Sequence, residues 1–196
     1  MDTARYWMGS LLVMALPPAV AYWYVVHPFA SFWRRLGARW SLTILFSGFA
    51  LGMWGMWVVR HWALGADLGT NLVLVGPAIL FYVISIYLEM NIRKHLELKT
   101  LVGVPEFSQD DQKGRVLCEG IYGRVRHPRY VAVIIGTLGW ALFVNYLGVY
   151  IMMFLTVPGL YLVAVLEERE LLTRFGDEYA GYCERVPRFV PRFRAR

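Results

Sequence analysis

The chain reads GIYGRVRHPRY at residues 120–130, directly before a long apolar segment that ends at Glu167-Glu168. If this segment folds back on itself as a helical hairpin, its two polar ends meet at one membrane surface. Arg126 and His127 then face the two glutamates. Cationic and acidic groups opposed in this way are suited to binding a small zwitterion.

The composition predicts an integral membrane protein. Of the 196 residues, 58% are hydrophobic and 16% aromatic, and the mean hydropathy is +0.45. This length suits one compact unit, and a soluble domain of this size could not bury so much apolar surface. Apolar runs of roughly 20 residues, the length that crosses a bilayer as a helix, recur at Tyr6–Val26 (broken by Pro17-Pro18), Trp40–Val59, Asn71–Met90, Tyr130–Val144 (short) and Leu147–Leu166 (with a kink at Pro158).

We therefore predict an all-α membrane fold of about five transmembrane helices, organised as a single domain over residues 1–196. Residues 1–90 form three amino-terminal spans. Residues 91–196 form a polar loop, the helical hairpin with a turn at Asn145-Tyr146, and a basic tail. The second part carries the predicted ligand site, which has no Rossmann-like pattern.

The distribution of basic residues predicts the orientation. Placing the amino terminus outside and the carboxyl terminus in the cytoplasm puts all but two of the 20 Lys and Arg residues, Arg5 and Arg60, on the cytoplasmic side. Cleavage of a signal peptide after Ala19-Val20-Ala21 would reverse this arrangement, so we predict that the first span is retained. The net charge of +6 is explained by these loops and does not require a nucleic-acid partner. The expected location is a bacterial-type inner membrane.

Two other groups of residues do not predict a site of their own. Cys118 and Cys183 have no metal-ligand spacing, so we predict no metal site and expect reduced thiols in the cytoplasm. His27, His61 and His95 are scattered, and each is interpreted as interfacial.

The polar residues of the carboxyl-terminal part resemble a known family. GIYGRVRHPRY, the Glu167-Glu168 pair and the run from Phe175-Gly176-Asp177-Glu178-Tyr179 to Pro187 are similar to the isoprenylcysteine carboxyl methyltransferases. The wider superfamily includes membrane phospholipid methyltransferases. The resemblance extends over about residues 114–191, whereas the first three helices match only in hydropathy.

The resemblance implies S-adenosylmethionine as the methyl donor and a lipophilic acceptor at the cytoplasmic face: an isoprenylcysteine-type carboxylate, a phospholipid amine or a thiol. It also implies that the cofactor is bound by Arg115, Val116, Leu117, Tyr122, His127, Pro128, Arg129, Tyr130 and Glu167. Charge complementarity supports this binding set. The carboxylate in the methionine part of the cofactor would pair with Arg126 or His127, and its ammonium group would pair with Glu167. Arg126 and Glu168 are candidates for positioning; no catalytic residue is identified.

The acceptor is not predicted by the sequence. Eukaryotic prenylcysteine enzymes carry an arginine one turn before the first glutamate, where this chain has Val163. Arg185 and Arg188 in the tail are candidate replacements. Two other functions stay open: an NADPH-dependent sterol or enone reductase, suggested by YCERVP at residues 182–187, and a non-catalytic membrane scaffold. The Glu-Glu pair favours methyl transfer.

Overall fold

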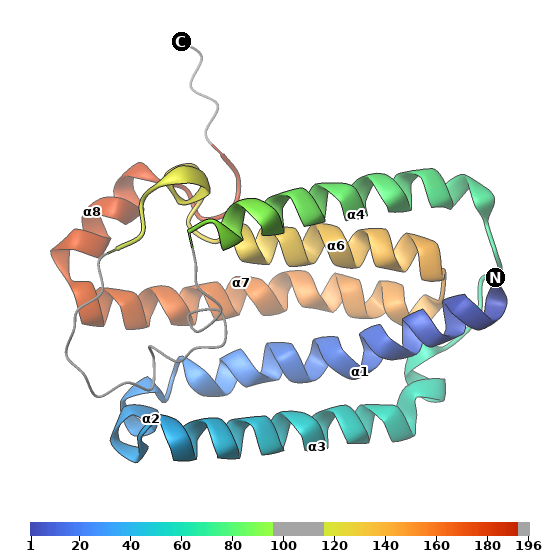
Figure 1. Cartoon of the computed structure of the whole chain (residues 1–196), viewed down its shortest axis with the longest axis horizontal. Coiled ribbons are helices and arrows are strands. Elements are labelled where there is room, and N and C mark those ends of the chain that lie inside the picture. Colours follow the sequence, from blue (N-terminus) through green and yellow to red (C-terminus); the bar gives the residue numbers. More distant parts are fainter. Residues whose placement is uncertain (96–115, 192–196) are drawn as a thin grey trace, which may run out of the picture.

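The computed structural model describes residues 1–95 and 116–191, which form a bundle of nearly parallel and antiparallel helices (Figure 1). The helices are α1 (Asp2–Val26), α2 (Ala30–Leu36), α3 (Ala38–Leu64), α4 (Leu72–Arg93), the 3-10 helix η2 (Gly120–Gly123), α6 (Pro128–Val144), α7 (Leu147–Phe175) and α8 (Asp177–Arg185). Within the two described ranges, the β-type pairing is confined to one isolated bridge between Asp67 and Tyr146.

The predicted membrane fold is confirmed. α1, α3, α4 and α7 are long and apolar enough to cross a bilayer, and α6 is a shorter apolar helix. Large apolar side chains such as Trp54, Val73 and Phe154 stay exposed on the outside of the bundle, as expected for surfaces that face lipid rather than water. The protein is an integral membrane protein.

Three helices differ from the sequence prediction. α1 continues through Pro17 and Pro18 without a break, which transmembrane helices tolerate because neighbouring groups satisfy the freed carbonyls. α2 occupies part of the segment predicted as a basic loop. α7 runs to Phe175, so its 29 residues span about 43 Å, more than the roughly 30 Å of a hydrocarbon core. Its last turns therefore extend beyond the hydrocarbon and end at Gly176, where φ is 57°.

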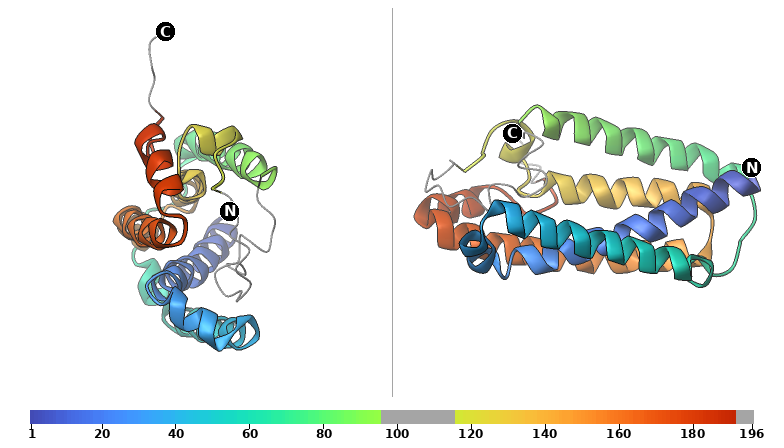
Figure 2. Two further views of the ribbon diagram at one scale, coloured as in Figure 1. Left: turned by 90° about the vertical axis from the view of Figure 1, so that its left-hand side faces the viewer. Right: turned by 60° about the horizontal axis from the view of Figure 1, so that its bottom comes forward.

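The long helices pack in the order α3, α1, α7, α6, α4 (Figures 1 and 2). The α4–α6 pair makes the most extensive contact of all. It depends on a small residue, because a Cβ on Gly139 would come within 2.8 Å of the Ala78 carbonyl oxygen. Gly148 is equally constrained at the start of α7, since a Cβ there would lie 1.8 Å from the Ala63 carbonyl oxygen.

A buried arginine closes the end of the bundle at which the amino terminus lies. The side chain of Arg5 is 1% exposed, and its Nε donates to the Val144 carbonyl at 2.9 Å. Its other nitrogens pair with Asp2 at 3.0 Å and with Asp67. Asn145 adopts a left-handed conformation (φ 53°) that forms the turn between α6 and α7, and its carbonyl accepts from Arg5 at 3.3 Å. Arg5 therefore fastens α1 to the loop between α3 and α4 and to the hairpin turn.

Candidate functional site

The candidate site lies at the opposite end of the bundle, where η2, α8 and the last turns of α7 come together (Figure 1). His127 precedes α6 and Pro128 occupies its first turn, where proline suits a helix because the amide hydrogen it lacks has no partner there. The backbone amides of Arg126 and His127 donate to the carbonyls of Pro187 at 2.9 Å and Arg188 at 3.1 Å. The tail after α8 thus lies along the segment before α6.

Glu168 is the centre of the charged cluster. Arg188 holds its carboxylate with two hydrogen bonds, from Nε to Oε1 at 2.9 Å and from Nη2 to Oε2 at 2.6 Å. His127 Nε2 lies 2.9 Å and Arg126 Nη2 lies 3.3 Å from Oε1. The residue is only 6% exposed. A buried carboxylate with three cationic partners is saturated, so Glu168 stabilises the arrangement of the cluster and has no capacity left for a ligand.

Glu167 lies beside Glu168 but has a different environment. Its Oε2 accepts from the Tyr130 hydroxyl at 2.7 Å and lies 3.3 Å from His127 Nδ1. Among the described residues, no donor contacts its Oε1, and 29% of the side chain is exposed. One carboxylate oxygen of Glu167 is therefore available to a ligand.

His127 connects the two glutamates, which favour its imidazolium form. Carboxylates accept hydrogen bonds and cannot donate them, so two carboxylate partners require both ring nitrogens to carry hydrogen. Burial of the ring opposes protonation, yet the hydrogen bonds and negative charges of Glu167 and Glu168 outweigh it and raise the pKa of His127 above its ordinary value. Including Arg126 and Arg188, three cations face two carboxylates.

Arg126 carries the second unsatisfied group of the site. Within the described part of the chain, its Nε is buried and has no hydrogen-bond partner. A buried donor without an acceptor costs about 1–3 kcal/mol, a cost that an anionic ligand group would remove. The cluster thus offers a free donor on Arg126 and a free acceptor on Glu167, the two complements of an amino-acid zwitterion.

Aromatic rings surround these charges. The Tyr130 ring stacks on His127 with centroids 5.3 Å apart and planes at 9°, and Phe189 of the tail lies 5.8 Å from the same imidazole. The buried Tyr122 lies in the neighbouring cluster with Ile92, and its carbonyl accepts from the Tyr182 hydroxyl at 2.7 Å.

The structure brings together most of the residues predicted for the site. Arg126, His127, Tyr130, Glu167 and Glu168 are in direct contact with one another, as described above. Leu117 packs beside Tyr122, whereas Val116 packs with the α8 tyrosines and donates its amide to Glu178 at 3.2 Å. The guanidinium carbon of Arg129 lies 5.7 Å from the Trp23 ring centroid.

The tail arginines occupy different places. Arg185 is exposed on α8, away from the contacts of the cluster. Arg188 lies inside the cluster, where Glu168 and the Tyr161 hydroxyl at 3.0 Å take up its donors. Arg115 lies outside the described residues. The sequence analysis missed Tyr161 and Phe189, because no spacing rule connects them to residues 126–130.

It also missed a second ion pair at this end of the bundle. Glu170 of α7 binds His27 and Arg34, although the sequence assigned His27 only to the membrane interface. The signal that could have found it is the position of Glu170, three residues after Glu167 and hence on the same face of the helix.

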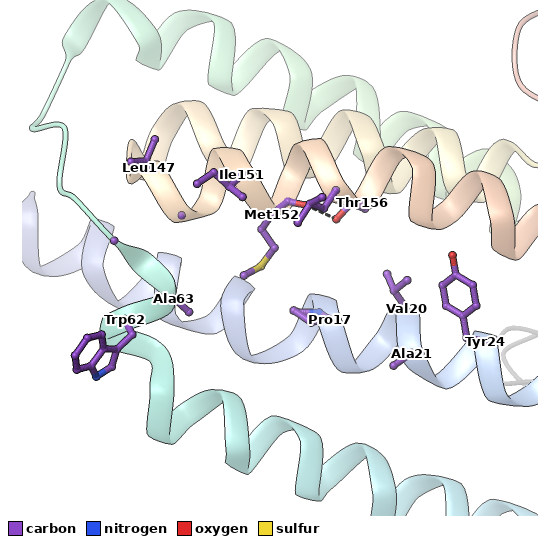
Figure 3. Close-up of a pocket in the computed structure, with 13 residues that line it drawn as sticks. Pro17, Val20, Ala21, Tyr24, Trp62, Ala63, Leu147, Ile151, Met152 and Thr156 are labelled. Carbon is purple, nitrogen blue, oxygen red and sulfur yellow. Dashed lines mark hydrogen bonds between the residues drawn. The ribbon is translucent and has the colours of Figure 1, made fainter.

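A separate apolar pocket of about 560 Å³ lies between α1, the end of α3 and the start of α7 (Figure 3). Its lining runs from Trp62 and Leu147 to Tyr24 and includes no charged residue. The Tyr24 hydroxyl donates to the Gly159 carbonyl at 2.9 Å. The pocket shares no residue with the charged cluster.

Comparison with known proteins gives two matches. Residues 73–178, more than half of the chain, match the family described as "Phospholipid methyltransferase". The chain is also 37% identical over 71 residues to "Methanethiol S-methyltransferase 1" of Bradyrhizobium diazoefficiens, in a match that covers 36% of this chain and 24% of that protein. The matched part thus spans about a quarter of the length of this curated relative. No solved structure matches the chain.

Proposed function

Because the chain belongs to the phospholipid methyltransferase family and is a membrane methyltransferase, we propose that it uses S-adenosylmethionine to methylate a lipophilic acceptor at the cytoplasmic face. The observation that carries the proposal is the pair of unsatisfied groups at the centre of the charged cluster. Arg126 Nε is a buried donor and Glu167 Oε1 an available acceptor. Both kinds of group are needed to bind the amino-acid end of this cofactor.

The residues present fit the cofactor. Arg126 would pair with its carboxylate and Glu167 with its ammonium, while Tyr122 and Tyr130 provide aromatic surface. Val116, Leu117, Pro128 and Arg129 complete the proposed binding set by resemblance, together with Arg115. When bound, S-adenosylmethionine supplies an electrophilic methyl group on a sulfonium.

The other cluster residues preorganise this site. Glu168 and Arg188 keep His127 between the two carboxylates, so Glu167 is oriented before any ligand arrives. Preorganised charges cost no rearrangement at the moment of reaction and act strongly where water is excluded. Positioning the acceptor against the donor is then the main contribution of the protein to the rate.

The orientation and the acceptor are part of the proposal. The charge bias of the loops supports an amino terminus outside and a carboxyl terminus in the cytoplasm, with the whole chain as a single membrane domain. The printed name of the relative makes a thiol the first acceptor to test. Phospholipid amines and prenylated carboxylates follow, and a role for Arg185 or Arg188 in binding them stays a proposal. The match to a methyltransferase family favours methyl transfer over NADPH-dependent reduction.

The test is ligand-dependent thermal unfolding of the detergent-purified protein. S-adenosylhomocysteine at 100 times its Kd is expected to stabilise the wild type by about 2.7 kcal/mol, and NADPH is expected to have no effect. Glu167→Ala should abolish the response, whereas Glu184→Gln, which alters an exposed carboxylate on α8, should keep it. Stabilisation by NADPH alone would reverse the proposal in favour of the reductase. A positive result leads to measuring labelled methyl transfer to thiols and to a lipid extract.

A further inference from the structure

Glu170 joins the carboxyl end of α1 to the part of α7 that extends beyond the hydrocarbon. Its Oε2 lies 3.1 Å from His27 Nδ1, and its Oε1 accepts from Arg34 Nη2 at 2.6 Å. The side chains of Glu170 and His27 are 8% and 2% exposed. A buried carboxylate that uses both oxygens for two different elements fixes their geometry, because losing one partner leaves an uncompensated charge.

The contacts continue from Glu170 around to Glu167. The Trp23 ring stacks on His27 with centroids 5.2 Å apart and planes at 19°, and it packs against the apolar cluster that contains Tyr130. The Tyr130 hydroxyl donates to Glu167 at 2.7 Å. Glu167 and Glu170 lie three residues apart on one face of α7, so the apolar cluster that contains Tyr130 lies between the two glutamates and Trp23.

These contacts combine residues inside the part of the chain that matches the family with residues outside it. Tyr130, Glu167 and Glu170 lie within the matched residues 73–178, whereas Trp23 and His27 lie outside them. The matched part carries the groups proposed to bind the methyl donor, which is common to such enzymes. Trp23 is the aromatic surface that α1 adds to the apolar cluster that contains Tyr130.

From this geometry we propose that Glu170 is a positioning residue for the acceptor. By holding His27 it keeps the Trp23 ring against the apolar cluster that contains Tyr130, where the ring forms the wall on which the hydrocarbon part of an acceptor lies. This inference rests on the proposed function. It assigns the methyl donor to the side of the site formed by Arg126 and Glu167, and the methyl acceptor to the side formed by α1.

The test compares Glu170→Gln with the wild type in lipid nanodiscs, using a series of alkanethiols from methanethiol to decanethiol as acceptors. The variant preserves the size of the side chain but removes its charge. We expect the KM for the longer thiols to rise about tenfold while the KM for S-adenosylmethionine changes less than about twofold. Arg169→Gln, which alters the exposed charge next to Glu170, is expected to leave both constants unchanged. Unchanged acceptor KM values in Glu170→Gln, or an equal rise in both constants, would overturn the inference.

A second measurement does not depend on turnover. In protein labelled with 5-fluorotryptophan, the Trp23 resonance is assigned by its disappearance in Trp23→Phe. Glu170→Gln is expected to shift or broaden this resonance, and Arg169→Gln to leave it in place. A wild type that methylates no thiol and binds no S-adenosylhomocysteine would count against the proposed function. The fluorine spectrum still decides the positioning role in that case, because an unchanged Trp23 signal in Glu170→Gln overturns it.

Discussion

Glu167 and Glu168 are adjacent and chemically identical, yet their contacts assign them different tasks. Glu168 receives two hydrogen bonds from Arg188 and lies against His127 and Arg126. Replacing Glu168 with Gln keeps its volume but leaves three cations facing a neutral amide. Removing one partner of a buried ion pair costs about 3–5 kcal/mol. Because Arg188 is 27% exposed and partly screened, we expect about 3 kcal/mol, the lower end of that range.

Glu167→Gln is the matched comparison. Glu167 has one hydrogen bond from Tyr130 and one longer ion pair with His127, so its loss is expected to cost about 1 kcal/mol. Intrinsic tryptophan fluorescence during heating in detergent measures both variants. With about 2–4 °C lost per kcal/mol in a protein of this size, Glu168→Gln should unfold about 6–12 °C below the wild type, and Glu167→Gln only a few degrees below it.

Ligand binding is expected to show the opposite order. S-adenosylhomocysteine should still stabilise Glu168→Gln but should not stabilise Glu167→Gln. The division of tasks would be refuted if Glu168→Gln unfolds at the wild-type temperature. It would equally be refuted if Glu167→Gln is the less stable variant and retains the full response to ligand.

Further predictions concern other parts of the molecule. The raised pKa of His127 implies that protonation of this residue stabilises the folded state. The stabilisation is complete below about pH 6.5 and declines as the pH rises through the pKa of the folded protein. Unfolding temperatures measured across this range should show the decline in the wild type and not in His127→Gln. Arg5→Met is expected to destabilise the protein by about 3 kcal/mol because buried acceptors lose their donor, as measured by thermal unfolding against an Arg60→Met control. Gly148→Ala is expected to reduce the yield of folded protein sharply, since its Cβ would overlap the backbone of α3, and size-exclusion profiles would show it. A membrane-impermeant maleimide is expected to label the exposed Cys118 in inverted membrane vesicles and not in intact cells; the reverse pattern would refute the proposed orientation.

The sequence was sufficient to predict the five long apolar helices and the main pair of polar clusters, because both depend on local patterns. Apolar length predicted the spans, and the turn at Asn145 placed the two ends of the hairpin together. Arg126, His127 and Glu167 therefore come into contact as the hairpin model requires. The resemblance to methyltransferases was also confirmed by the family match.

The remaining features depend on contacts between segments far apart in the chain. Arg188 reaches Glu168 because the tail pairs with the backbone of residues 126–127, and no pattern within the tail indicates this pairing. The tasks of Glu167 and Glu168 cannot be separated from an adjacent Glu-Glu sequence, since only the neighbours of each side chain distinguish them. The sequence predicted a membrane span that ends at Leu166, whereas α7 continues to Phe175, where Leu171 and Phe175 pack against the tyrosines of α8.

The arginine at the amino-terminal end of the bundle has a consequence for biogenesis. Arg5 leaves the ribosome well before Val144 and Asn145, whose carbonyls it needs as acceptors. Until the hairpin inserts, α1 therefore carries an arginine that lacks its final partners, and such a charge favours staying near the membrane surface. α1 is thus locked in place only after the hairpin has formed, and a chain that stops before the hairpin turn pairs Arg5 with Asp2 and Asp67 but leaves it without its two carbonyl acceptors.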